Sequence, residues 1–196
     1  MAAVLEKNYT TKFTTADLAL LPEDGKLYEI IEGDLFVSRQ PNWHHQFTCG
    51  QLFRYLQEWN DKTDTGVANA APGVLFGDED DVAPDVIWVS NQRLTEILGE
   101  DGKLHAAPEI VIEVVSPGWS NQQRDRQMKL KLYSRRGVVE YWIVDWQQRS
   151  IEIYSREDGR LQLRETLLKT DSLTSPLLPE FSCNLASLFF PPPPKS

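Results

Sequence analysis

The segment that decides the fold is Pro108-Glu109-Ile110-Val111-Ile112-Glu113-Val114-Val115-Ser116-Pro117. Its apolar residues are all β-branched and nearly continuous, which predicts a β-strand covered on both faces. Pro117 ends the strand because proline has no N–H to donate to a neighbouring strand. The segment also holds one carboxylate, Glu113, which is costly to bury unless it is paired or binds a metal ion. In an arbitrary strand, an ion pair or contact with solvent is the more common explanation.

Composition limits the classes of protein that need to be considered. The chain has 196 residues, of which 41% are hydrophobic and 25% charged, as expected of a single globular domain over residues 1–196. A formal net charge of −9 argues against broad, nonspecific binding of nucleic acid, but it allows a local groove or a site whose carboxylates hold cations. No apolar run is long enough to span a membrane and no signal peptide is recognisable, so we expect a cytoplasmic protein. The two cysteines, Cys49 and Cys183, form neither a metal-ligand spacing nor a disulfide framework.

Hydrophobic periodicity and turn residues predict the elements in chain order. An irregular arm (1–13) precedes a short helix capped by Thr14 or Thr15. The N-terminal half then continues with hairpin strands 27–31 and 34–38, a helix at 44–60, strands 66–70 and 73–76, an acidic loop at 77–81, a buried strand at 82–89 and a helix at 91–98.

The C-terminal half follows the Glu113 strand. We expect a helix over 120–136, capped by Ser120 or Asn121 and ended by Gly137. The remaining elements are a buried strand at 140–145, its hairpin partner at 150–154, a last strand at 161–168, a segment at 177–190 whose aromatic residues pack back on the body, and a proline-rich tail at 191–196.

Three residues form a candidate catalytic set. Asp85 opens one predicted core strand, Glu113 lies in another, and Lys129 lies on the helix that follows. Two carboxylates on neighbouring strands can bind Mg²⁺ through oxygen ligands, and a nearby lysine can position or deprotonate a water molecule. Asp125, Lys129 and Tyr133 recur every fourth residue and therefore share one helix face. These are suitable parts for phosphodiester hydrolysis, and we expect Asp85, Glu113 and Lys129 to converge in one cleft.

Two further positions are accessory candidates. Glu29 lies in the first hairpin strand, where a solvent-facing side chain is the more common arrangement. His44 and His45 begin a helix, and because adjacent helical residues point in different directions they make a poor two-ligand metal site. A surface or capping role is the more common one for either histidine, although one of them could face a pocket.

The sequence resembles the Uma2 family (DUF820), a group of restriction-endonuclease-like proteins abundant in cyanobacteria. The resemblance covers about residues 14–190, and its most specific parts are the Glu113-Val-Val-Ser-Pro117 strand end and the Glu140-Tyr-Trp-Ile-Val-Asp145 run. It implies an α/β (α+β) fold of the PD-(D/E)xK nuclease superfamily, in which helices flank a central mixed β-sheet, here with an N-terminal hairpin.

The resemblance also implies a site and its cofactor. Asp85 and Glu113 would bind Mg²⁺ or Mn²⁺, with Glu29 and His45 as accessory residues. One departure stands out: the signature lysine follows the acidic residue by two positions, and here that position is Val115. Lys129 of the next helix matches the lysine that stands in for it in Uma2-like proteins, whereas Lys131 should point to another face.

Three functions remain open from the sequence. The first is a metal-dependent nuclease that acts on nucleic acid, with DNA as the expected partner and a homodimer as the expected assembly, because two strands need two cuts. The second is a protein of the same fold without hydrolytic activity that binds nucleic acid or protein; the net charge and Val115 favour it. The third is another carboxylate enzyme such as a glycosidase, which would leave the lysine unexplained.

Overall fold

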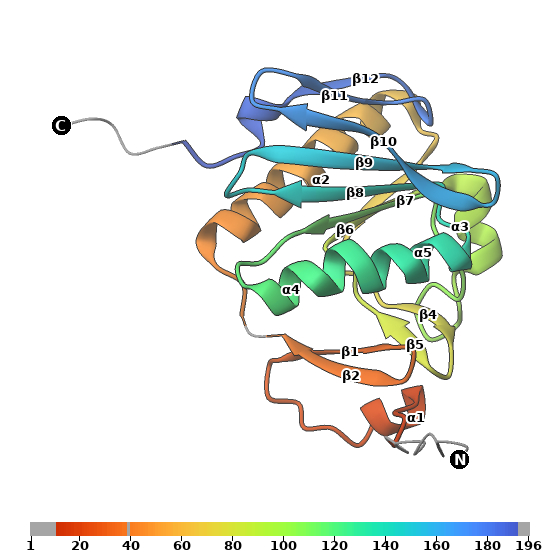
Figure 1. The fold of residues 1–196 in the computed structure, drawn as a ribbon. Helices are drawn as coiled ribbons and strands as arrows, with labels where there is room; N and C mark the ends of the chain where they lie inside the picture. The colour runs from red at the N-terminus through yellow and green to blue at the C-terminus, as the bar shows by residue number, and fades with distance from the viewer. Residues whose placement is uncertain (1–10, 39, 192–196) are drawn as a thin grey trace, which may run out of the picture.

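A computed structural model describes residues 11–38 and 40–191 of the chain. Its centre is a six-stranded sheet in the order β10-β9-β8-β7-β6-β3, and β7 and β8 form its parallel pair (Figure 1). The strands are β3 (Gly66–Ala70), β6 (Val86–Ser90), β7 (Ile110–Val114), β8 (Glu140–Asp145), β9 (Ser150–Glu157) and β10 (Arg160–Leu168). The predicted fold class, a mixed sheet flanked by helices, is confirmed.

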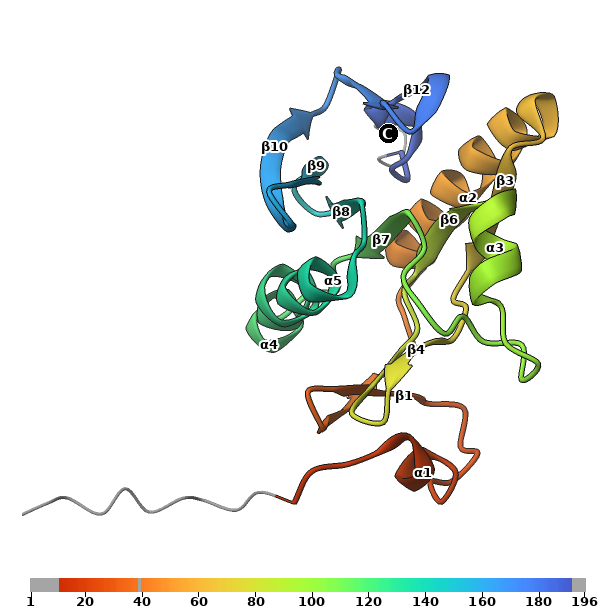
Figure 2. The same ribbon diagram turned by 90° about the vertical axis from the view of Figure 1, so that its right-hand side faces the viewer.

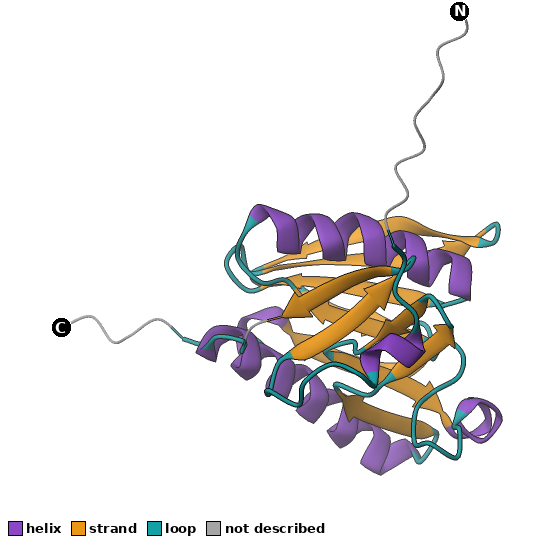
Figure 3. Cartoon of the chain, turned by 90° about the horizontal axis from the view of Figure 1, so that it is seen from below, coloured by secondary structure: helices purple, strands orange, loops and turns teal. Residues whose placement is uncertain are grey.

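Helices cover both faces of this sheet (Figures 2 and 3). On one face lies α2 (Trp43–Thr63), and on the other lies a helical segment that runs from Trp119 to Arg136. All five residues of β7 are buried. Ile110, Ile112 and Val114 pack on the α2 side, while Val111 packs on the opposite side. Because side chains alternate along a strand, Glu113 shares the face of Val111, beneath the second helical segment.

That helical segment has three parts. α4 (Trp119–Gln123) leads into a π-helical turn, η1 (Arg124–Lys129), which is followed by α5 (Leu130–Arg136). The predicted helix is therefore present, but it is not α-helical throughout. It begins at Trp119, so the predicted caps Ser120 and Asn121 lie inside its first turn. Gly137 ends it in the left-handed conformation, as predicted (φ 96°).

A second sheet, in the order β2-β1-β5-β4, lies below the first in Figure 1. Its strands are β1 (Leu27–Ile31), β2 (Asp34–Ser38), β4 (Val74–Gly77) and β5 (Asp80–Val82). The N-terminal hairpin therefore has its predicted bounds, and Thr14 caps α1 (Thr15–Leu18). The prediction of an acidic loop at 77–81 was wrong in part. Asp80 and Asp81 lie in β5, are buried, and pair with Arg136 and Lys103 respectively.

The C-terminal region adds elements that the sequence did not predict. Strand β10 is followed by an antiparallel pair, β11 (Ser172–Ser175) and β12 (Leu178–Asn184), and by a 3₁₀ turn, η2 (Leu185–Ser187). Phe189 packs into the α2 side of the core, as expected of this segment. Helix α3 (Asn91–Ile97) matches its prediction. Most of the predicted N-terminal arm and of the proline-rich tail lies outside the described residues.

The helices of the described part of the chain were also compared with the dimensions of a bilayer. Within residues 11–38 and 40–191, none of them combines the length and the apolar character that a membrane crossing requires.

Candidate metal-binding active site

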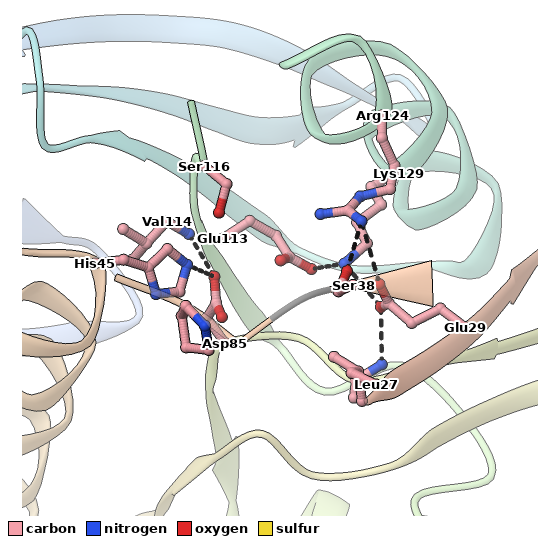
Figure 4. Close-up of a pocket in the computed structure, with 12 residues that line it drawn as sticks. Leu27, Glu29, Ser38, His45, Asp85, Glu113, Val114, Ser116, Arg124 and Lys129 are labelled. Atoms are coloured by element: carbon pink, nitrogen blue, oxygen red, sulfur yellow. Dashed lines mark hydrogen bonds and ion pairs between the residues drawn. The ribbon is translucent and has the colours of Figure 1, made fainter. Parts of the chain in front are cut away.

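The predicted site residues line one cavity of about 100 Å³ at the edge between the two sheets (Figure 4). Asp85 directly precedes β6, Glu113 lies in β7, and Lys129 ends the π-helical turn. Both accessory candidates also line the cavity. Its full lining is Leu27, Glu29, Ser38, Pro41, His45, Ala83, Asp85, Glu113, Val114, Ser116, Arg124 and Lys129.

Lys129 joins two buried glutamates. Its Nζ lies 2.8 Å from Glu113 Oε1 and 2.8 Å from Glu29 Oε1. The Tyr133 hydroxyl donates a second hydrogen bond to Glu113 Oε1, at 2.8 Å. Glu29 is therefore buried (1% exposed) rather than solvent-facing, because β1 packs against the main sheet at this point. The expectation that Asp125, Lys129 and Tyr133 share one face agrees with the burial of all three.

Asp85 is held from two sides. Its Oδ2 accepts a hydrogen bond of 2.8 Å from the backbone N–H of Val114, the residue that follows Glu113. The same oxygen lies 3.3 Å from Nε2 of His45. His45 is buried (5% exposed), so the more common surface or capping role does not apply to it; Asn42 caps α2 instead. His44 lies outside the cavity and stacks on Trp146.

Each predicted metal-binding carboxylate has one oxygen to spare. Every hydrogen bond or ion pair of the Asp85 side chain goes to Oδ2, and every one of Glu113 goes to Oε1. Among the described residues, none donates to Asp85 Oδ1 or to Glu113 Oε2. Neither oxygen is fully shut off from solvent, and the Asp85 side chain is 25% exposed, so a ligand that approaches from the cavity could reach both oxygens.

Negative charge exceeds positive charge around the cavity. The carboxylates of Glu29, Asp85, Glu113 and Asp125 face the cations of Arg124 and Lys129. With all four carboxyls ionised and His45 neutral, two positive charges against four negative ones leave −2. The proton that Glu113 holds at neutral pH reduces this surplus to −1 until a cation displaces it. Arg124 pairs with Asp125 through Nε at 3.0 Å and approaches Glu29 at 3.9 Å. The surplus favours a divalent cation, which would neutralise it.

The neighbouring charges and burial change the pKa values of Glu113 and Lys129. Burial raises the pKa of Glu113 to about 8; Lys129 acts against the increase, and Asp85, Asp125 and Glu29 add to it. Burial on its own would lower the pKa of Lys129, but the carboxylates of Glu113 and Glu29 outweigh burial and raise that pKa. Lys129 therefore stays protonated near neutral pH.

The donor set fits a hard cation such as Mg²⁺ or Mn²⁺. Such ions prefer carboxylate oxygens, and the two spare oxygens belong to residues of the same cavity. Val115, at the usual lysine position, is buried in the apolar core beside Val111, so a lysine there would have to displace core packing. The helix supplies the ammonium group instead.

Three contributors were not predicted as site residues. Arg124 lines the cavity, Tyr133 binds Glu113, and Cys49 lies with its Sγ 3.5 Å from Nδ1 of His45. The four-residue spacing of Tyr133 from Lys129 and of Cys49 from His45 was the available signal, because residues at that spacing share a helix face. Burial, together with the carboxylates of Asp85 and Glu113, raises the pKa of the Cys49 thiol far above its usual value.

Comparisons with known proteins bear on the fold and the family of the chain. The chain is similar to the crystal structure of "a putative nuclease belonging to DUF820" from Anabaena variabilis ATCC 29413, with a TM-score of 0.72 and 19% sequence identity over 90% of this chain and 97% of that one. At this identity the similarity shows the fold alone. No functionally curated protein matches the chain.

The family model gives the assignment. The model of Uma2, described as "Putative restriction endonuclease", matches residues 15–186. This range includes the two glutamates, the aspartate and the lysine of the cavity, so the match and the site concern the same part of the molecule. The chain belongs to the Uma2 family.

Proposed function

We propose that this protein is a metal-dependent nuclease that hydrolyses phosphodiester bonds of nucleic acid, with DNA as the substrate. One observation carries the proposal: Asp85 and Glu113 each keep one carboxylate oxygen without a partner from the described residues, and both residues line the same negatively charged cavity. Both oxygens are accessible from that cavity, so a cation could bind them without breaking an existing hydrogen bond.

Asp85 and Glu113 would hold Mg²⁺ or Mn²⁺, and Glu29 would contribute indirectly. When bound, the cation would polarise the scissile phosphate and lower the pKa of a water molecule. Glu29 is engaged by the backbone N–H of Ala83 at 3.1 Å and by Lys129, so its role is to fix the lysine. His45 holds Asp85 from the α2 side.

Lys129 would orient groups at the site rather than abstract a proton. A general base must be able to take a proton near neutral pH, and the raised pKa of Lys129 excludes the neutral amine. Its ammonium group instead fixes the Glu113 carboxylate and places positive charge beside the cavity, where it would stabilise negative charge that develops on an attacked phosphate. Arg124, which also lines the cavity, supplies a second such charge.

The assembly and location are proposed with the function. Double-strand cleavage by a single site per chain needs two copies, so we propose a homodimer with two-fold symmetry. We also propose that the protein works in the cytoplasm, where its substrate DNA lies.

The test is a cleavage screen with matched variants. Supercoiled, linear double-stranded and single-stranded DNA, and RNA, are incubated with Mg²⁺, with Mn²⁺, or with a chelator. We expect cation-dependent cleavage by the wild type and its loss in Glu113→Gln. The control is Glu140→Gln, which removes a buried charge on the neighbouring strand β8 outside the cavity.

Two results would overturn the proposal. One is cleavage by Glu113→Gln at the wild-type rate. The other is the absence of cleavage of every substrate by folded wild-type protein, which would leave an interaction module as the function.

A further inference from the structure

A second set of metal-ligating groups lies on the α2 side of the cavity. His45 and Cys49 are one helical turn apart on α2, and Asp85 faces them from the start of β6. One ligand atom from each of the three residues can be chosen so that all lie within 4.8 Å of one another. His45 and Cys49 are 5% and 7% exposed, so the group is shielded from bulk solvent on the helix side.

The donor types differ from those of the carboxylate site. A nitrogen, a sulfur and an oxygen together favour Zn²⁺ over Mg²⁺, because thiolate and imidazole are softer ligands than carboxylate or water. Zinc binds these atoms at about 2.0–2.3 Å in a tetrahedron. The three ligand atoms lie within 4.8 Å of one another, so they would move closer together around the ion. Three protein ligands also leave the fourth position open toward the cavity that Asp85 lines.

Charge and hydrogen bonding agree with such a ligand. Cys49 Sγ lies 3.5 Å from His45 Nδ1, whereas Asp85 Oδ2 lies 3.3 Å from the other ring nitrogen, Nε2. One cation binds one nitrogen of an imidazole, so Nδ1 would be the ligand beside Cys49, and Asp85 would leave Nε2 to join them. Binding would displace the thiol proton. The resulting thiolate and the Asp85 carboxylate would together neutralise a divalent cation, which a buried site requires.

We propose that His45, Cys49 and Asp85 form a binding site for a thiophilic divalent cation, Zn²⁺ by its chemistry. The site shares Asp85 with the proposed Mg²⁺ or Mn²⁺ site, and two divalent cations on one carboxylate repel each other, so we expect each class of cation to weaken binding of the other. Zinc would then act as an inhibitor of the hydrolytic site. That inhibition rests on the proposed function, whereas zinc binding itself does not.

Cobalt(II) tests the binding site directly, because it adopts zinc geometries and reports its ligands by absorption. A thiolate ligand gives a charge-transfer band in the near ultraviolet, and tetrahedral coordination gives intense visible bands. Full-length protein is titrated with Co²⁺ without oxygen, and Zn²⁺ is then added to displace it. We expect both kinds of band in the wild type, and their loss when Zn²⁺ is added.

The chain offers a matched control for the cysteine. Cys183 is buried in β12 and belongs to the apolar core on the α2 side. Cys183→Ser should keep the charge-transfer band, Cys49→Ser should lose it, and His45→Gln should weaken Co²⁺ binding at least about tenfold, as expected for the loss of a ligand. Circular dichroism establishes that each variant is folded.

The result that overturns the proposal is a folded wild-type protein without the charge-transfer band at millimolar Co²⁺. Persistence of the band in Cys49→Ser would do the same. Cleavage enters neither measurement, so the zinc site can fail while the nuclease stands, and the reverse also holds.

Discussion

Glu113 and Glu140 are buried glutamates on the neighbouring parallel strands β7 and β8, yet the protein surrounds them differently. Both oxygens of Glu140 have partners: Arg164 at 2.9 Å on Oε1, and the Trp142 indole and Ser175 hydroxyl, each at 2.9 Å, on Oε2. Glu113 has two donors on one oxygen and none from the described residues on the other.

The two glutamates also belong to opposite faces of the sheet. Glu140 shares its face with Trp142, on the α2 and β12 side, while Glu113 faces α5. A buried carboxylate whose oxygens are all satisfied fixes the packing of the elements around it. One with an unpartnered, accessible oxygen in a cavity can bind a ligand there, and this difference separates a structural acid from a candidate functional one.

The largest expected effect comes from replacing the basic residue that pairs with each glutamate, which is Lys129 for Glu113 and Arg164 for Glu140. Lys129→Met leaves both Glu29 and Glu113 buried without their shared partner, and breaking such a pair costs about 3–5 kcal/mol of unfolding free energy. Arg164→Met should cost less, because Glu140 keeps its neutral donors and Arg164 is partly exposed. Urea denaturation of the two variants measures the difference.

Equal losses in both variants would remove the distinction between the two glutamates. Lys129→Arg is the companion variant. It keeps the charge, so it should recover part of the stability that Lys129→Met loses, and a cleavage assay on it remains meaningful if the methionine variant does not fold.

The second effect is the change in melting temperature when Mn²⁺ is added. Ligand that binds only the folded state stabilises it by about 2.7 kcal/mol at 100 times its Kd. We expect Mn²⁺ to raise the melting temperature of the wild type and of Glu140→Gln, and to have little effect on Glu113→Gln. A full Mn²⁺ response in Glu113→Gln would place the cation elsewhere.

The third effect is a pH dependence. Because the pKa of Glu113 is raised from its ordinary 4.5 to about 8, the metal-free protein holds a proton on this carboxyl at neutral pH. A cation must displace it, so affinity should rise about tenfold per pH unit up to about pH 8 and then level off. Titration calorimetry with Mn²⁺ in buffers of different ionisation enthalpy measures the released proton. A pH-independent Kd, with no proton released, would contradict the raised pKa.

The raised pKa of Glu113 also determines whether the metal-free protein becomes more or less stable as the pH rises. A carboxyl whose pKa is raised on folding stabilises the native state most fully below its unfolded pKa, and it loses that contribution as the pH rises through about 8. Glu140→Gln should keep this loss of stability, whereas Glu113→Gln should not show it.

The smallest effect is that of one hydroxyl group. Tyr133→Phe removes a donor to Glu113 but leaves Lys129 on the same oxygen, so we expect a loss of about 1 kcal/mol. Tyr141→Phe is the matched control, because its hydroxyl binds the backbone carbonyl of Asp125 instead. The Tyr133 variant should also shift the pH dependence of Mn²⁺ binding upward, and the Tyr141 variant should not. A shift of equal size in both would mean that the effect is general packing.

Local sequence patterns predicted much of the fold. The β-branched run around Glu113 gave a strand with two covered faces, and the Glu32-Gly33 turn gave the hairpin bounds, because both depend on neighbouring residues. The pair β11 and β12 was missed, since β11 has only four residues and Pro179 with the polar residues of β12 obscures the apolar alternation. The π-helical turn was missed because its extra residue changes the hydrogen bonding but hardly the apolar pattern.

The site was predictable to the extent that its strands were. Asp85 and Glu113 follow from strand ends, and Lys129 from a helix face. Glu29 and His45, the accessory candidates, line the cavity, but their burial was not predictable, because it depends on contacts distant in sequence such as those of Glu29 with Ala83 and Lys129. Cys49 was not predicted as a site residue because it belongs to no metal-ligand motif. His45 lies at ordinary helical spacing from it, and Asp85 lies on a distant part of the chain.

The π-helical turn at Arg124–Lys129 has a consequence for how this site tolerates insertions and deletions. A π turn holds one residue more than an α turn, so it acts as an adjustable joint in the chain. Deleting one residue there would restore regular helix and leave the faces of the flanking turns nearly unchanged, because the wider π turn takes up its extra residue within about the same rotation. Within the turn, a deletion between Asp125 and Lys129 would bring Arg124 and Asp125 one residue closer to Lys129 and so change their contacts with it. The length of this turn, as much as the identity of its side chains, therefore sets which charges meet at the cavity.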